Sequence, residues 1–160
     1  MKKIFVTLLL STLFINAFAQ KVNLYNAKSD GMKLLDSALV IAKNTNKHVM
    51  VQIGGNWCSW CYLFDNFYKN DAELDSIVKE NYVVIHVNFD GKKASFPILE
   101  RLEYPHRFGV PVIVIVNAEG RRLHTQNSEF LESGNSYNRK KMLSFFKSWT
   151  VMSVSPETYK

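Results

Sequence analysis

One pair of cysteines constrains this chain more than any other feature. Cys58 and Cys61 are three positions apart and are the only two cysteines in 160 residues. A structural disulfide normally closes a long loop, because its stabilisation grows with loop length, and a four-residue loop gains little. The apolar run from His48 to Ile53 and the turn at Gly54-Gly55 precede the pair, which predicts a strand, a turn and a helix that begins near Cys58. We therefore expect a reactive pair rather than a structural one.

The predicted position of the pair at a helix start has a chemical consequence. A cysteine there meets free backbone N–H groups and the positive end of the helix dipole, which favour thiolate over thiol. The thiolate is the form that attacks a disulfide. Cys58 is therefore the expected nucleophile, and Cys61, one turn inside the helix, is the expected resolving cysteine. This chemistry uses the redox-active disulfide Cys58–Cys61 itself and predicts no separate cofactor.

Helix and strand signals alternate along the rest of the chain. They predict helices over residues 30–43, 58–67, 70–78 and 138–149, and strands over residues 48–53, 82–89, 112–116 and 121–126. Asn70, with Glu73 three residues later, resembles a capping box. Residues 128–137 are predicted to be a loop, and those after Thr150 a loose tail. The order of elements indicates an α/β fold, a three-layer α/β/α sandwich with a central mixed β-sheet, in which the last two strands form a hairpin.

The first 19 residues are predicted to be a signal peptide rather than part of the fold. Lys2 and Lys3 precede an apolar run from Ile4 to Ile15, and Ala17-Phe18-Ala19 has small residues where signal peptidase cleaves. The run is shorter than the roughly 20 apolar residues of a spanning helix. Cleavage after Ala19 would leave residues 20–160 as one domain with a core of about 30–150. We therefore expect a periplasmic or secreted protein, of Gram-negative bacterial type, without stable membrane insertion.

The charge of the chain does not indicate a nucleic-acid partner. The formal net charge of +6 falls to about +4 without the two lysines of the signal peptide. The basic residues are scattered, with short clusters only at Arg121-Arg122 and Arg139-Lys140-Lys141. A nucleic-acid-binding protein normally shows a basic stripe interleaved with aromatic residues, and no such stripe is present in the sequence.

Four segments together resemble the thioredoxin superfamily. The stretch from Val49 to Cys61, with the motif Trp57-Cys58-Ser59-Trp60-Cys61, is similar to the family's active-site strand and helix. Residues 82–90 resemble the next strand, residues 108–112 the segment that carries the family's cis-proline, and residues 118–120 the following hairpin turn. The likeness is greatest to exported bacterial thioredoxin-like thiol:disulfide interchange proteins with a WCxxC active site and an extra N-terminal helix. It implies the sandwich fold predicted above.

The resemblance also implies roles for individual residues. Pro111 is expected to face the cysteines in the cis form, and the backbone of Val110 to bind an extended substrate segment. Trp57 and Trp60 are expected to form an apolar rim that receives the substrate. Gln52 replaces the buried acid of thioredoxin, and His86 matches the lysine that approaches that acid. His86 is therefore a candidate proton relay for Cys61, since imidazole titrates near neutral pH, or else a structural histidine.

These observations predict a thiol–disulfide oxidoreductase that acts on protein disulfides in the cell envelope, as a reductase rather than an oxidase. The absence of a histidine between the cysteines favours this direction. Its expected partners are protein thiols and disulfides, and a membrane electron donor or acceptor is a further candidate.

Two alternatives remain open at this point. One is a redox-inactive binding module, a thioredoxin fold with a permanent structural disulfide, because a fold does not by itself specify a function. The other is a zinc site made of both cysteines and two of the four histidines, His48, His86, His106 and His124. No histidine pair has the usual ligand spacing of zinc sites, so no metal is expected.

Overall fold

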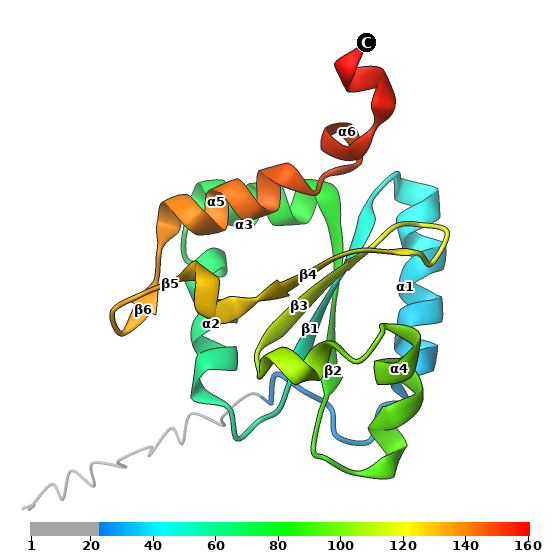
Figure 1. Ribbon diagram of the computed structural model, residues 1–160, viewed down its shortest axis with the longest axis vertical. Coiled ribbons are helices and arrows are strands. Elements are labelled where there is room, and N and C mark those ends of the chain that lie inside the picture. Colours follow the sequence, from blue (N-terminus) through cyan, green and yellow to red (C-terminus); the bar gives the residue numbers. More distant parts are fainter. Residues whose placement is uncertain (1–22) are drawn as a thin grey trace, which may run out of the picture.

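The computed structural model describes residues 23–160, which form a four-stranded sheet covered by helices on both faces (Figure 1). The predicted signal peptide lies outside the described residues. In chain order the helices and strands are α1 (Gly31–Thr45), β1 (His48–Gly54), α2 (Ser59–Lys69), α3 (Ala72–Asn81), β2 (Tyr82–Asn88), α4 (Phe96–Arg101), β3 (Val112–Val116), β4 (Arg122–Asn127), β5 (Glu132–Ser133), β6 (Ser136–Tyr137), α5 (Arg139–Ser148) and α6 (Val151–Val154). Within the described residues, no helix is long and apolar enough to cross a membrane.

The main sheet is mixed and has the strand order β2-β1-β3-β4. β1 runs parallel to β2 and antiparallel to β3, and β3 and β4 form an antiparallel hairpin. Side chains alternate between the two faces of a strand. Val51 and Val114 accordingly pack with α1 and α4, whereas Met50 and Ile113 pack with α2, α3 and α5 on the opposite face (Figure 1). The predicted α/β/α sandwich with a central mixed sheet is confirmed.

Side-chain caps define where the helices that surround the site begin. Asp30 accepts hydrogen bonds from the backbone of Met32 and Lys33 at the start of α1. The predicted capping box at Asn70 is wrong, because Asp71 caps α3 and Asn70 ends α2. An ionised carboxylate at this position also interacts favourably with the helix dipole, which an asparagine does not.

Two segments that lack periodicity in the sequence are more ordered than predicted. Residues 128–137, expected to be a loop, contain a short 3₁₀ helix and the two-residue strands β5 and β6, which pair around Gly134. The expected loose tail contains α6, capped by Thr150, and a 3₁₀ turn at residues 156–159. Such short elements carry too few residues to show a hydrophobic period, so their contacts rather than their pattern define them.

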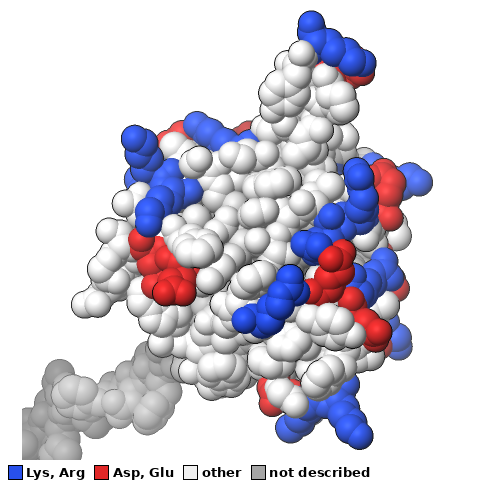
Figure 2. All heavy atoms as spheres, in the orientation of Figure 1, with Lys and Arg blue, Asp and Glu red and all other residues white. Residues whose placement is uncertain are grey.

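Charged side chains are dispersed over the surface. On the face shown in Figure 2, Lys and Arg lie among Asp and Glu around an uncharged central area, and no continuous basic stripe crosses this face. Arg139 bridges Asp71 and Glu73, and Lys147 also contacts Glu73. Exposed pairs of this kind contribute about 0–1 kcal/mol each to stability.

Candidate active site

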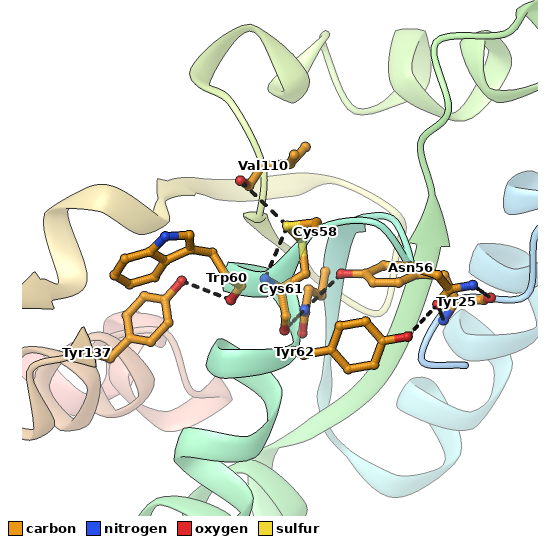
Figure 3. Close-up of a disulfide and its surroundings, with 9 residues drawn as sticks. Tyr25, Asn56, Cys58, Trp60, Cys61, Tyr62, Val110 and Tyr137 are labelled. Atoms are coloured by element: carbon orange, nitrogen blue, oxygen red, sulfur yellow. Dashed lines mark hydrogen bonds between the residues drawn. A yellow bond between two sulfur atoms is a disulfide. The ribbon is translucent and has the colours of Figure 1, made fainter. Parts of the chain in front are cut away.

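The two cysteines form a disulfide at the N-terminus of α2 (Figure 3). Cys58 is the capping residue, and its sulfur accepts a hydrogen bond from the backbone N–H of Cys61 at 3.1 Å. The side chain of Cys58 is 6% exposed, whereas Cys61 is fully buried. Cys58 is therefore the sulfur that a partner can reach, and it already receives the backbone hydrogen bond that would stabilise a thiolate.

The segment before β3 lies against the outer sulfur. The Val110–Pro111 peptide bond is cis, as the resemblance implied. The carbonyl oxygen of Val110 is 3.9 Å from the Cys58 sulfur (Figure 3). Pro111 is buried and Val110 is half-buried. An extended chain that reached Cys58 would pass along the backbone of Val110, and substrate binding there stays a prediction.

The two tryptophans of the motif occupy different environments. Trp57 is 66% exposed. Trp60 is half-buried: its ring stands edge-on to Tyr137 at 5.5 Å, and its carbonyl oxygen accepts a hydrogen bond from the Tyr137 hydroxyl. A hollow of about 470 Å³ lies beside it, lined by Ser59, Trp60, Leu63 and Asn135. Trp57 is thus free to contact a partner, while Trp60 is held as one wall of this hollow.

A residue absent from the sequence-based expectations, Tyr25, lies behind the disulfide. Its side chain is fully buried and packs with both cysteines. The side-chain amide of Gln52 donates to the Tyr25 hydroxyl at 2.8 Å and to the carbonyl oxygen of Cys61 at 2.9 Å. Burial raises the pKa of Tyr25 far above its usual value, so its hydroxyl stays protonated. The apolar and aromatic pair Leu24-Tyr25 was the sequence signal for a buried residue here. It was missed because it lies before the first predicted helix, outside any periodic segment.

Asn56 clamps this N-terminal segment to the active-site turn. Its side-chain oxygen accepts a hydrogen bond from the Tyr25 backbone N–H at 3.0 Å, and its side-chain NH₂ donates to the Tyr25 carbonyl oxygen at 2.7 Å. The Tyr62 hydroxyl donates to the same Asn56 oxygen at 2.9 Å (Figure 3). The turn that leads into Cys58 therefore also positions Tyr25, through Asn56.

A second polar cluster lies next to Tyr25. The buried carboxylate of Asp65 accepts hydrogen bonds from His86 at 3.1 Å, from the Tyr68 hydroxyl at 3.1 Å and from Lys69 at 2.7 Å. Burial alone would raise the pKa of Asp65, but the hydrogen bonds from His86 and Lys69 outweigh it and lower the pKa. The His86 ring also stands edge-on to Tyr25 at 5.6 Å. These contacts direct His86 toward Asp65 and Tyr25, and its role as a proton relay stays a prediction.

Replacing Asp65 with asparagine should lower the free energy of unfolding at pH 7 by about 1–3 kcal/mol, because three donors lose a charged acceptor. Since the folded-state pKa of Asp65 lies below its unfolded value, this stabilisation is present above pH about 4 and is lost as the pH falls through the folded pKa. Urea unfolding of both proteins between pH 7 and pH 2.5 measures the effect. A difference that stays constant over this range would contradict the assignment.

Three of the four histidines contact groups away from the cysteine pair, and His86 contacts Asp65 and Tyr25 as described above. His48 contacts the carbonyl oxygen of Trp149 at 2.8 Å, and His124 stacks on the Trp149 ring at 4.3 Å. His106 packs against the Phe89 ring. In residues 23–160, no group of three or more His, Cys, Asp and Glu side chains is arranged to hold a metal ion.

The order of elements, the cysteine pair at the start of α2 and the cis-proline beside it can now be compared with known proteins. Residues 35–129, more than half of the chain, match the family described as a thioredoxin-like domain. The chain belongs to the thioredoxin-like family. The family match begins ten residues after Tyr25 and includes both cysteines, so Tyr25 reaches the disulfide of this thioredoxin-like protein from outside the matched part.

Solved structures show the same fold at low sequence identity. The disulphide isomerase from Xylella fastidiosa Temecula1 is 20% identical, with a TM-score of 0.67 over 78% of this chain and 94% of that one. The C-terminal domain of Neisseria meningitidis DsbD in its oxidised form is 14% identical, with a TM-score of 0.53 over 75% and 96%. A DsbH oxidoreductase is 20% identical, with a TM-score of 0.50 over 75% and 82%. A comparison with curated proteins finds no significant match.

Proposed function

We propose that this thioredoxin-like protein is a thiol–disulfide oxidoreductase that reduces disulfides of proteins in the cell envelope. The observation that carries the proposal is the placement of Cys58. Its sulfur caps α2, accepts the Cys61 backbone N–H and lies beside the carbonyl oxygen of Val110, next to a cis-proline. A helix N-terminus favours the thiolate, and the neighbouring backbone offers an extended substrate a place to bind.

The reaction follows from the different accessibility of the two sulfurs. In the reduced protein, the Cys58 thiolate attacks one sulfur of a substrate disulfide. The substrate S–S bond breaks, and the other substrate sulfur leaves and takes up a proton. Cys61 then loses its proton and attacks Cys58, which releases the second substrate sulfur as a thiol. The substrate gains two electrons, and the protein is left with the Cys58–Cys61 disulfide that the structure contains.

The direction of the reaction rests on the residues around Cys58. Ser59 and Trp60 separate the cysteines, and neither supplies the charge-assisted hydrogen bond to a thiolate that an imidazolium could donate. In residues 23–160, the polar contacts of the Cys58 sulfur are with backbone groups, which favours a moderately rather than strongly oxidising pair. A reductase needs an electron source, for which we propose a membrane-bound dithiol donor.

The cell-envelope location rests on the first 19 residues, whose charged start, apolar middle and small-residue end are typical of a secretory signal peptide. Among the proteins that share the fold, one is named a disulphide isomerase and another an oxidoreductase. Their names support thiol–disulfide chemistry as the class of reaction.

A redox titration of the purified protein in dithiothreitol or glutathione buffers, followed by tryptophan fluorescence, tests the proposal. We expect a reversible two-electron transition between about −120 and −270 mV, nearer the lower value. The Cys58→Ser variant is the control and should show no transition. A reduction potential below about −300 mV would identify a structural disulfide, and the protein would then be a binding module. A potential near −120 mV would reverse the assigned direction.

The exposed ring of Trp57 should matter for protein substrates only. Because the side chain is 66% exposed, Trp57→Ala should leave the melting temperature nearly unchanged but lower kcat/KM for a disulfide-bonded protein about tenfold, as expected for loss of an aromatic contact. Reduction of glutathione disulfide measures the chemistry alone and should be unaffected. Tyr159→Ala removes a ring that is 76% exposed in the C-terminal 3₁₀ turn and serves as the control. An equal loss with both substrates would disprove the contact.

A further inference from the structure

We propose that Tyr25 is a positioning residue for the resolving cysteine: in the reduced protein its hydroxyl donates a hydrogen bond to the Cys61 sulfur, as thiol and more strongly as thiolate, and thereby stabilises the reduced form over the disulfide. The N-terminal segment before α1 would then help set the reduction potential of the pair. This inference rests on the proposed function and identifies a group that tunes the same site.

The first argument is proximity. A Cβ placed on Gly54 would lie 2.4 Å from the Cys61 sulfur and 2.6 Å from the Tyr25 hydroxyl oxygen. Both atoms therefore border the same point at the end of β1 and lie no more than 5.0 Å from each other. Tyr25, Cys58 and Cys61 also form one buried cluster. The phenol oxygen is thus a polar atom of the buried cluster that holds the Cys61 sulfur.

The second argument is that the hydroxyl has a proton available. Its oxygen accepts a hydrogen bond from the Gln52 amide, and in the disulfide form it donates to no other residue of the described part of the chain. A disulfide sulfur is a poor acceptor, whereas a thiolate accepts hydrogen bonds strongly. Reduction breaks the S–S bond, and rotation of the Cys61 side chain can then bring its sulfur within hydrogen-bond distance of the Tyr25 hydroxyl.

The third argument is that three hydrogen bonds from two residues hold Tyr25 in place. Asn56 fixes the Tyr25 backbone through two hydrogen bonds, and Gln52 ties the hydroxyl to the carbonyl oxygen of Cys61 through its amide. Burial keeps Tyr25 protonated by raising its pKa. Tyr25 is therefore a fixed donor that does not give up its proton during the reaction.

The other ionisable groups around Tyr25 do not duplicate this contact. Asp65 and His86 bind each other, and the His86 ring stands edge-on to Tyr25. The hydroxyl of Tyr62 is directed at Asn56, and that of Tyr137 at the carbonyl oxygen of Trp60. All four groups remain in place in a variant that removes only the Tyr25 oxygen, so a change in the pair can be attributed to that oxygen.

The test is Tyr25→Phe, which keeps the buried ring and removes the hydroxyl. In a dithiothreitol titration, the two thiols of the reagent are oxidised to its cyclic disulfide while the Cys58–Cys61 bond is reduced to two thiols. We expect the equilibrium constant for reduction to fall about tenfold, which corresponds to a potential about 30 mV lower. In a Cys58→Ser background, the acid constant of the Cys61 thiol, followed by thiolate absorbance, should also fall about tenfold.

Tyr82→Phe is the matched control, because its buried hydroxyl donates to the carbonyl oxygen of Phe146 and lies at the opposite end of β2 from the disulfide. This variant should keep the wild-type potential. Urea unfolding of Tyr25→Phe in both redox forms adds a second measurement, and the reduced form should lose more stability than the oxidised one.

Each result has a distinct meaning. An unchanged potential and Cys61 titration in Tyr25→Phe, or an equal loss of stability in both redox forms, would overturn the inference and leave the proposed function intact. A reduction potential of the wild-type pair below about −300 mV would overturn the proposed function, and this inference with it.

Discussion

The Cys61→Ser variant should form mixed disulfides through Cys58 and fail to release them. The accessible sulfur of Cys58 remains, with its place at the start of α2, while the buried sulfur that would displace the substrate is gone. After incubation with a disulfide-bonded peptide, mass spectrometry should find the peptide attached to Cys58 in nearly every molecule. Turnover, measured as peptide thiol released per protein, should fall to the background rate because the second exchange step is lost.

The reciprocal variant, Cys58→Ser, is the control for this result. It retains only the fully buried Cys61 sulfur, so it should capture no peptide under the same conditions. Capture by Cys58→Ser but not by Cys61→Ser would show that the roles of the two cysteines are reversed. Capture by neither variant would favour a binding module whose disulfide does not take part in exchange.

The second large effect is expected at Gly54, the last residue of β1. A methyl group there would lie 2.4 Å from the Cys61 sulfur and 2.6 Å from the Tyr25 hydroxyl, both well inside contact distance. The disulfide holds the sulfur and Asn56 holds Tyr25, so neither can move freely. Gly54→Ala should therefore lower the free energy of unfolding by about 1–3 kcal/mol, as overpacking does in other cores. Urea unfolding with the disulfide intact measures this loss.

The adjacent glycine provides the matched control. A Cβ on Gly55 would lie 2.4 Å from the side chain of Trp57, but that ring is 66% exposed and can move into solvent. Gly55→Ala should therefore destabilise the protein less than Gly54→Ala does. Equal losses in the two variants would mean that the contact with Cys61 and Tyr25 is not what requires glycine at position 54.

Most of the architecture could be predicted from local patterns. The β-branched run at residues 112–116 marked β3, and the apolar run before Gly54 marked β1. Predictions were wrong where a segment was short or where two capping candidates were adjacent. Asn70 and Asp71 are both acceptable capping residues, and only the path of the chain places Asp71 at the start of α3.

The sequence predicted the cysteines and the proline of the candidate site. It did not predict the hydrogen-bonded groups that pack behind the disulfide. Cys58, Cys61 and Pro111 belong to motifs whose spacing is visible along the chain. The hydrogen bonds between Asn56 and Tyr25 join residues 31 positions apart, and His86 meets Asp65 across 21 positions. No local period reports such contacts, because they depend on which faces of separate elements pack together.

The sequence by itself therefore determined the cysteine pair, its position at a helix start and the sandwich around it, because these follow from spacing, periodicity and turn residues. Only the tertiary structure decided which sulfur a partner can reach and that Tyr25 lies against the other one. The reason is that burial is a property of packing. The exposure of Cys58 and Cys61 depends on the segments that carry Val110 and Tyr25, which are distant in the chain and meet at the disulfide only when the sheet has assembled.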